Sequence, residues 1–326
     1  MRQMRPFTLV ASILVSSVVA GCSLKSTPVA PVPSLGVQSV IRQDAHPAND
    51  AYVLPKLYVN QGTVGVLVYK QAGTDQAPIK ILTNGLHQPE GEFVNSNGDL
   101  YVTNFQATSV SVFKRGANAP YKTLNDPGYI PGSAVVDSDG TVYVCNYENS
   151  SPNPPGDIAV YAGGATSPTS SLPAPVSGDW VLWCALDGHH NLYVGYTNEN
   201  SGGSNVAEYP GGAGTGQLLN LKIGFPGQME FNSKGNLVAA DELNYQIDTF
   251  KLPGTKPIGT ITAPVTGPPI VGMTLNANSS HVYMADYNSG QVYEFAYPKG
   301  TLLDTITPSN GAFDLQGLAA DPSAPL

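Results

Sequence analysis

The stretch LYVTNFQATSVSVFKRG (residues 100–116) reads as two short strands joined by a turn, and VYMADYNSGQVYEFAYPKG (residues 282–300) has the same pattern. In both stretches an aromatic residue lies inside an apolar triplet, and a second aromatic ends the next strand shortly before a glycine. Aromatic and β-branched residues bounded by turn-forming residues are typical of antiparallel strands. The two stretches therefore predict a repeated two-stranded unit.

This unit occurs six times, and its first strands begin 42–50 residues apart. Most first strands follow another apolar strand and a polar turn such as NSNGD or DSDGT. The Asn, Asp and Gly residues of such turns accept the positive φ of tight hairpins. With a weaker apolar segment downstream, the unit has four antiparallel strands, which is the size of a propeller blade. The first strands begin at Leu57, Leu100, Val142, Leu192, Leu237 and Val282.

The two ends of the repeated region complement each other. The segment LQGLAADPSA (residues 315–324) resembles the strand that precedes a first strand, but no first strand follows it, whereas Leu57 has no such strand before it. Pairing Leu315–Asp321 with the strand at Leu57 would cover both open sheet edges. We therefore predict an all-β, six-bladed β-propeller over residues 51–326, closed by its C-terminal strand.

The segment MRQMRPFTLVASILVSSVVAGC (residues 1–22) has the features of an export signal, because arginines precede an apolar run that ends in small residues. The run is short for a membrane span. Its end, VAGC, resembles the bacterial lipobox, and this resemblance implies cleavage before Cys22 and lipid attachment to the Cys22 thiol. We expect a signal peptide over residues 1–21 and, from the lipidated Cys22, a flexible Pro/Ser-rich tether over residues 22–50. The alternative is an ordinary signal peptide with a chance cysteine.

The lipoprotein resemblance also implies a location. A residue other than Asp after the lipidated cysteine usually allows export to the outer membrane in that family, and Ser23 stands there. We expect a monomer anchored through its lipid to the membrane of the bacterial cell envelope, at the outer membrane, on its periplasmic face or on the surface. The net charge of −9 and the absence of a basic cluster beyond the N-terminus argue against nucleic-acid binding.

The repeats over residues 57–321 resemble the six-bladed family of NHL-repeat, SMP-30/gluconolactonase-like and streptogramin-lyase-like propellers. The P-x-G-apolar, D-x-x-G, LYVAD-like and V-x-VF elements carry this resemblance. It implies a ligand site at one mouth of the central channel, but it does not select an activity, since the architecture hosts many functions. Lyase chemistry needs histidine and glutamate at that mouth, and His87 is the one histidine that the repeat places near it, which disfavours a lyase.

Two sets of loops should build the mouth. The residues that end the first strands share one repeat position and should form a polar ring, although Asn and Asp there also cap turns by accepting backbone N–H bonds. Aromatic residues beside this ring would suit a protein, peptide or glycan ligand, or would pack blade against blade. The ring comprises Gln61, Asn104, Asn146, Tyr196, Asp241 and Asp286. The neighbouring aromatics are Phe105, Tyr147 and Tyr287, and the other loops add His87, Glu90, Tyr129, Trp180, Phe225, Gln228, Ile270, Phe313 and Gln316.

Two functions follow from these residues. The first is a non-catalytic binding or scaffold module. The second, implied by resemblance to SMP-30-like lactonases, is a metal-dependent hydrolase that holds Ca²⁺ or another divalent cation with carboxylate and amide oxygens. The element PEGEFV (residues 89–94) loosely resembles the family's Glu-Gly element, although no proline follows Gly91. The implied metal ligands are Glu90, Asn146, Asp241 and Asp286.

Cys145 and Cys184 are the only cysteines besides Cys22. The repeat places them near the same mouth in adjacent blades, and an exported protein can form disulfides. Two interpretations stay open at this point: a disulfide between Cys145 and Cys184, or two small buried side chains that fill the core.

Overall fold

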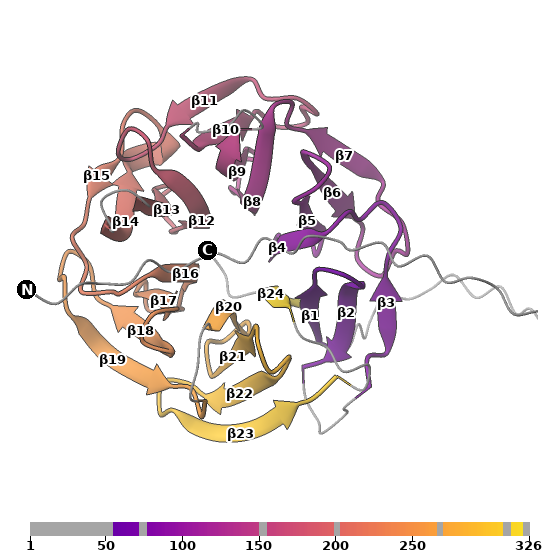
Figure 1. The fold of residues 1–326 in the computed structure, drawn as a ribbon, viewed down its shortest axis with the longest axis vertical. Coiled ribbons are helices and arrows are strands. Elements are labelled where there is room, and N and C mark those ends of the chain that lie inside the picture. The colour runs from indigo at the N-terminus through magenta and orange to yellow at the C-terminus, as the bar shows by residue number, and fades with distance from the viewer. Residues whose placement is uncertain are drawn as a thin grey trace, which may run out of the picture. The chain divides into compact units, whose positions relative to one another are not determined.

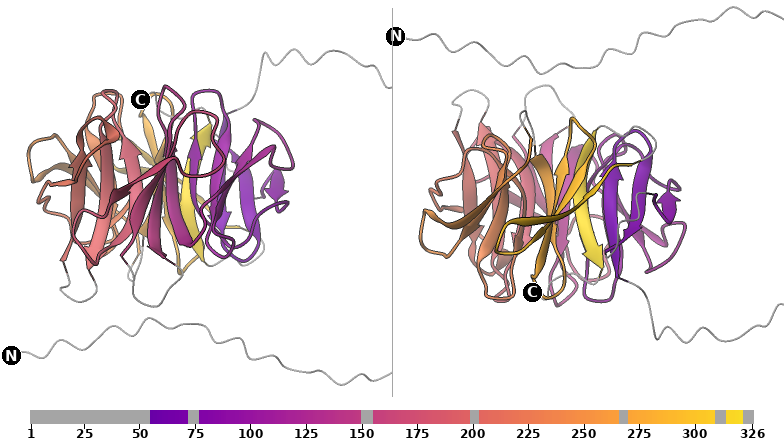
Figure 2. Two further views of the ribbon diagram at one scale, coloured as in Figure 1. Left: turned by 90° about the horizontal axis from the view of Figure 1, so that it is seen from above. Right: turned by 90° about the horizontal axis from the view of Figure 1, so that it is seen from below.

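The structure, a computed structural model, describes residues 55–71, 77–149, 155–198, 203–265, 270–308 and 314–321. These residues form six four-stranded antiparallel sheets, arranged as blades around a central axis (Figure 1). Seen from the side, the inner strands run along that axis (Figure 2). The predicted six-bladed propeller is therefore confirmed. The predicted signal peptide, Cys22 and the tether lie outside the described residues.

Each blade runs from an innermost strand at the axis to an outermost strand at the rim. Blade I consists of β24 (Leu315–Asp321), β1 (Lys56–Gln61), β2 (Gly65–Lys70) and β3 (Lys80–Leu82). Blade II consists of β4 (Pro89–Val94), β5 (Leu100–Asn104), β6 (Ser109–Phe113) and β7 (Lys122–Asn125). Blade III consists of β8 (Tyr129–Val136), β9 (Val142–Asn149), β10 (Asp157–Tyr161) and β11 (Ser170–Pro173).

The remaining blades repeat this order. Blade IV consists of β12 (Trp180–Leu186), β13 (Leu192–Asn198), β14 (Gly203–Tyr209) and β15 (Gln217–Leu218), with the short 3-10 helix η1 (Pro210–Gly212) between the last two. Blade V consists of β16 (Pro226–Phe231), β17 (Leu237–Asp241), β18 (Gln246–Phe250) and β19 (Pro257–Thr262). Blade VI consists of β20 (Ile270–Leu275), β21 (His281–Asp286), β22 (Val292–Ala296) and β23 (Thr301–Ile306).

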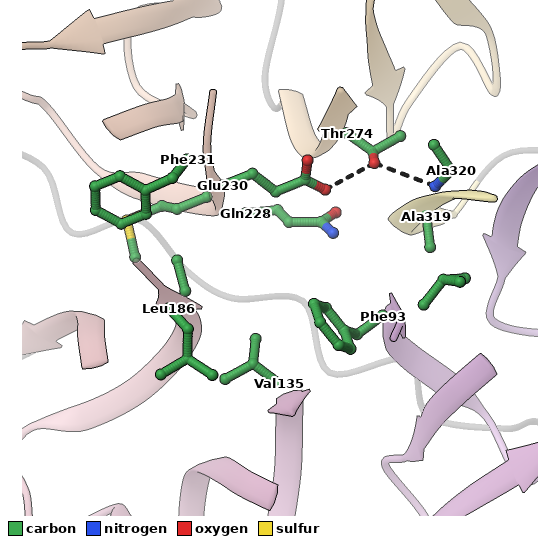
Figure 3. Close-up of a pocket in the computed structure, with 12 residues that line it drawn as sticks. Phe93, Val135, Leu186, Gln228, Glu230, Phe231, Thr274, Ala319 and Ala320 are labelled. Atoms are coloured by element: carbon green, nitrogen blue, oxygen red, sulfur yellow. Dashed lines mark hydrogen bonds between the residues drawn. The ribbon is translucent and has the colours of Figure 1, made fainter. Parts of the chain in front are cut away.

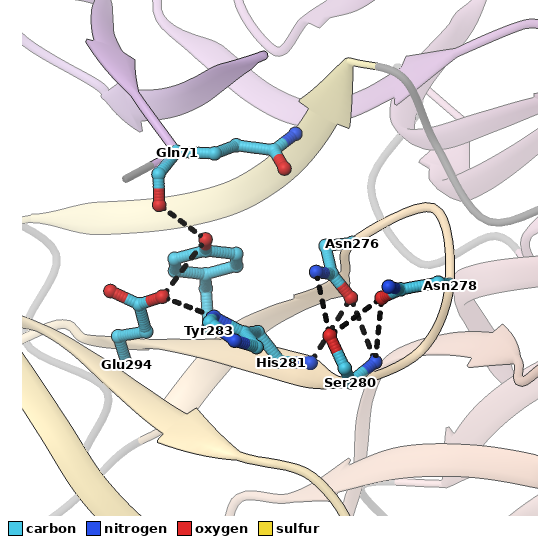
Figure 4. Close-up of polar contacts among 7 residues, drawn as sticks. All are labelled: Gln71, Asn276, Asn278, Ser280, His281, Tyr283 and Glu294. Carbon is cyan, nitrogen blue, oxygen red and sulfur yellow. Dashed lines mark hydrogen bonds and ion pairs between the residues drawn. The ribbon is translucent and has the colours of Figure 1, made fainter. Parts of the chain in front are cut away.

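The ring closes as the sequence predicts, because β24 pairs antiparallel with β1 and places Ala320 opposite Leu57. Side chains also join blade VI to blade I across the closure (Figure 4). The Tyr283 hydroxyl lies 2.7 Å from the carbonyl oxygen of Gln71, just after β2, and 3.2 Å from a Glu294 carboxylate oxygen, and these two acceptors share its one proton. The same Glu294 oxygen lies 2.5 Å from Nδ1 of His281. Strand pairing thus completes blade I, and the Tyr283 side chain links blade VI to it.

Glycines set the spacing of the inner strands around the axis. A Cβ on Gly317 would lie 2.8 Å from the carbonyl oxygen of Glu90, and a Cβ on Gly132 would lie 2.8 Å from that of Leu182. A Cβ on Gly272 would overlap the carbonyl oxygen of Gln316. Neighbouring inner strands thus approach more closely than any side chain permits, which explains the glycine of the repeated inner-strand motif.

Gln228 in β16 joins inner strands across the axis. Its Nε2 donates to the carbonyl oxygens of Leu318 (2.6 Å) and Glu92 (3.4 Å). Its Oε1 accepts the N–H groups of Leu318 (2.9 Å) and Met273 (3.2 Å). One buried amide therefore connects β16 to β4, β20 and β24, and all its donors and acceptors are used.

We predict that Gly272→Ala destabilises the propeller by about 1–3 kcal/mol, because the added methyl must displace the backbone of β24. The control is Gly259→Ala on the exposed strand β19, where a Cβ meets no atom within 4 Å. Urea unfolding of both variants measures the effect. Equal stability of the two variants would show that close backbone contact does not constrain the ring.

Candidate functional site

Three predicted aromatic residues gather at the mouth formed by the loops that precede the innermost strands. The ring centroids of Phe105 and Tyr147 lie 6.2 Å apart, and those of Tyr147 and Trp180 lie 4.6 Å apart. The three side chains come from blades II, III and IV, and each is only partly buried. This aromatic cluster (Phe105, Tyr147 and Trp180) is a continuous, partly exposed apolar surface.

The predicted polar ring is buried, and its side chains hold loops. Asn104 Oδ1 accepts the N–H of His87 (2.9 Å), and Asn104 Nδ2 donates to Ser111 Oγ (2.9 Å). Asp241 Oδ2 accepts the N–H of Gly224 (2.7 Å). Asp286 accepts the backbone N–H of Asn288 (3.0 Å) and the Ser289 hydroxyl (2.6 Å). These residues act as turn caps, which was the alternative interpretation of the repeat position.

The other ring members are also buried. Asn146 Nδ2 donates to Asp157 Oδ1 (2.7 Å), whereas Asn146 Oδ1 is buried without a hydrogen-bond partner. Tyr196 packs in the core between blades III and IV, and Gln61 is buried at the end of β1. The remaining predicted mouth residues divide by exposure. His87 is exposed; Glu90, Tyr129, Phe225 and Gln316 are partly buried; Gln228 and Ile270 are buried; Phe313 lies outside the described residues.

Carboxyl groups gather at this end of the channel. Burial, with the nearby Asp314 as a second cause, raises the pKa of Glu90 to about 8. Burial and then the proximity of Glu90 and Asp241 raise the pKa of Glu242 well above its usual range, although a hydrogen bond from Trp183 opposes the shift. Tyr287 hydrogen-bonds Asp314 on this side rather than joining the aromatic cluster. At neutral pH the protonated carboxyl of Glu90 can donate a hydrogen bond.

Sequence reasoning selected Glu90 but missed Glu242 and Asp314. Glu242 directly follows ring residue Asp241, in the repeat position that Phe105, Tyr147 and Tyr287 occupy in other blades. Reading every residue at that position, and not only the aromatic ones, would have found Glu242. Asp314 directly precedes β24, as Gln88 directly precedes β4 in blade II.

The implied metal ligands do not form a cation site. Asp241 and Asp286 direct their oxygens at their own loops, and Asn146 is paired with Asp157. In the part of the chain that the structure describes, no group of three or more His, Cys, Asp or Glu residues could hold a metal ion. The donor set therefore does not fit the divalent cation that the lactonase resemblance implies.

Cys145 and Cys184 are both buried free thiols, so of the two open interpretations the structure agrees with small core side chains and not with a disulfide. Cys184 Sγ lies 3.2 Å from Ser133 Oγ, and that hydroxyl oxygen accepts the N–H of Cys184 (2.9 Å). Burial, with Cys184 as a hydrogen-bonding neighbour, raises the pKa of the Cys145 thiol. The pair contributes to the contact between β8, β9 and β12.

Comparison with known proteins identifies the fold but no family. No protein-family model and no curated protein sequence matches the chain. A chain in the crystal structure of a nidogen/laminin complex superposes with a TM-score of 0.63 at 14% identity, covering 82% of this chain and 98% of that one. A protein of unknown function from Bacteroides caccae superposes with a TM-score of 0.61 at 12% identity, covering 82% of this chain and 99% of that one. Within the described residues, no helix has the length and apolarity needed to cross a membrane.

We predict that Glu90→Gln removes part of the pH dependence of folding. Because the pKa of Glu90 is raised from 4.5 to about 8 in the folded protein, the folded state keeps a proton that the unfolded chain releases, and stability falls as pH rises through this window. The variant should be more stable than the wild type by roughly 1–2 kcal/mol at about pH 8 and should lose this advantage near pH 4. Urea unfolding across this pH range measures the difference, and a difference independent of pH would contradict the shift.

Proposed function

We propose that this protein is a lipid-anchored lipoprotein of the bacterial cell envelope, whose propeller is a non-catalytic binding or scaffold module for a protein, peptide or glycan. The observation that carries the proposal is the partly exposed aromatic cluster of Phe105, Tyr147 and Trp180 at the channel mouth. Aromatic faces bury large areas at little entropic cost, and they are common anchors in binding sites.

The composition of the mouth supports this class of ligand. The aromatic cluster belongs to blades II to IV, whereas Glu242 follows β17 of blade V and Asp314 precedes β24 of blade I. Carboxyl groups and aromatic faces at one mouth suit a ligand that has both apolar surface and many hydrogen-bonding groups. Peptides and sugars have this character.

The likeness to a chain of the nidogen/laminin complex supports the proposal at the level of architecture, since a propeller of this fold occurs in a protein–protein complex. The metal-dependent hydrolase is not proposed, because Asp241 and Asp286 hold turns and do not offer free oxygens to a cation.

We predict that Trp180→Ala and Tyr147→Ala each weaken ligand binding by about ten- to a hundredfold, the usual cost of truncating an aromatic anchor. Peptide and glycan arrays would identify a ligand, and calorimetry would give the affinities. Ile258→Ala is the control, since this side chain is 61% exposed on outer strand β19. Equal affinities for the wild type and both mouth variants would exclude this mouth as the binding surface.

We predict that Cys22→Ser abolishes membrane attachment, because the acyl chains that anchor a lipoprotein are attached at this thiol. Membrane fractionation of cells that express each form measures the change: the wild type should sediment with membranes, and the variant should not. Retention of Cys22→Ser in the membrane fraction would rule out the lipid anchor.

A further inference from the structure

The channel holds a cavity at the end of the inner strands opposite the aromatic cluster (Figure 3). It lies near the turns that connect each innermost strand to the next strand of its blade. Each blade contributes one residue of its innermost strand at an equivalent position. In blade II this residue pairs with Tyr101 of the neighbouring strand, and in blade VI it pairs with Tyr283. The cavity volume is about 40 Å³, which is room for about three water-sized groups. The six equivalent residues are Phe93, Val135, Ala185, Glu230, Thr274 and Ala319.

Glu230 is the one ionisable residue among the described residues that line this cavity. The Thr274 hydroxyl donates to Glu230 Oε1 (2.7 Å), and the Leu275 N–H donates to Oε2 (2.9 Å). These two bonds hold the carboxyl in place and leave acceptor capacity on both oxygens. Gln228 also lines the cavity, but its amide is fully engaged by backbone groups.

The rest of the wall is apolar. Phe93 projects into the hollow from the side facing Glu230, and Val135, Leu186 and Ala319 complete the surface (Figure 3). A carboxyl with free acceptor capacity, opposite an aromatic ring in an otherwise apolar wall, is suited to an organic cation on an apolar chain, since the carboxylate hydrogen-bonds the cation and the ring packs against the chain. An anion or a purely apolar group would leave the buried carboxyl unpaired.

A larger cleft adjoins the cavity, because Phe93 and Val94 line both. The cleft has a volume of about 640 Å³ and is lined by residues of blades II and III that include Tyr101, Arg115 and Asp137. A ligand chain that leaves the cavity past Phe93 would enter this cleft.

We propose that the axial cavity binds a primary ammonium group at the end of an aliphatic chain, with Glu230 as its counter-ion and Phe93 against its methylene groups. This site is independent of the aromatic cluster, which lies at the other end of the channel. Two kinds of molecule carry the required group: a free alkylamine, and the lysine side chain of a peptide.

Calorimetric titration of the full-length protein with n-hexylamine, and with 1-hexanol as the neutral analogue, tests the proposal at about pH 8. Burial raises the pKa of Glu230 to about 7, so the carboxylate predominates there, while the amine stays protonated. We expect the amine to bind at least about tenfold more tightly than the alcohol. Equal affinities, or no binding of the amine, would overturn the proposal without any variant having to fold.

Variants then locate the site. Glu230→Gln keeps the side-chain shape and should weaken n-hexylamine binding at least about tenfold, and Phe93→Leu should weaken it several-fold. Trp180→Ala should leave amine binding unchanged, even if it abolishes binding at the aromatic cluster, so the two proposals can fail separately. Unchanged amine affinity in a folded Glu230→Gln variant would overturn the assignment.

A peptide arm distinguishes the two sources of the ammonium group. The probe is acetyl-Gly-Lys-Gly-amide, and its control is the same peptide with the lysine amine acetylated. Tighter binding of the lysine peptide than of n-hexylamine would assign the site to a peptide side chain, and the reverse order would assign it to free amines; both results support the ammonium site. An acetylated peptide that binds as well as its parent would contradict it.

Discussion

The ring depends on backbone-to-backbone contact between neighbouring innermost strands. Where Gly317 meets the carbonyl of Glu90, or Gly132 meets that of Leu182, there is no space for a side chain. This contact brings the inner strands close enough for one amide, that of Gln228 in β16, to bond three of the others. It also narrows the central channel, so that the side chains next to these glycines determine which groups each end of the channel can accept.

The two ends of the channel differ because the repeat positions are filled differently. At one end, Glu90 and Glu242 lie near each other with raised pKa values, and blades II to IV contribute aromatic rings. At the other end, five of the six equivalent positions are uncharged and Glu230 is the exception. A symmetrical backbone thus supports two chemically distinct openings.

The fold could be predicted from the sequence because the repeat length gives the blade size and the number of repeats gives the number of blades. The strand that is missing before Leu57 and present at residues 315–321 predicts how the ring closes. It was insufficient for the site because residue type does not determine side-chain direction. Asp241 and Asn104 have side-chain oxygens that could bind a ligand, but these oxygens accept hydrogen bonds from the backbone N–H groups of nearby loops. The cavity at Glu230 was missed for another reason: the turns NSNG and NSKG align Phe93 with Glu230, but the sequence does not show that the side chains at this position line a cavity.

Pairing between β24 and β1 has a consequence for biogenesis. Synthesis proceeds from the N-terminus, so β1 emerges some 250 residues before its inner partner, and its hydrogen-bonding edge stays uncovered throughout. The propeller cannot finish folding until residues 315–321 are available to cover that edge. A chain that stops just before residue 315 would therefore be the species most prone to aggregate.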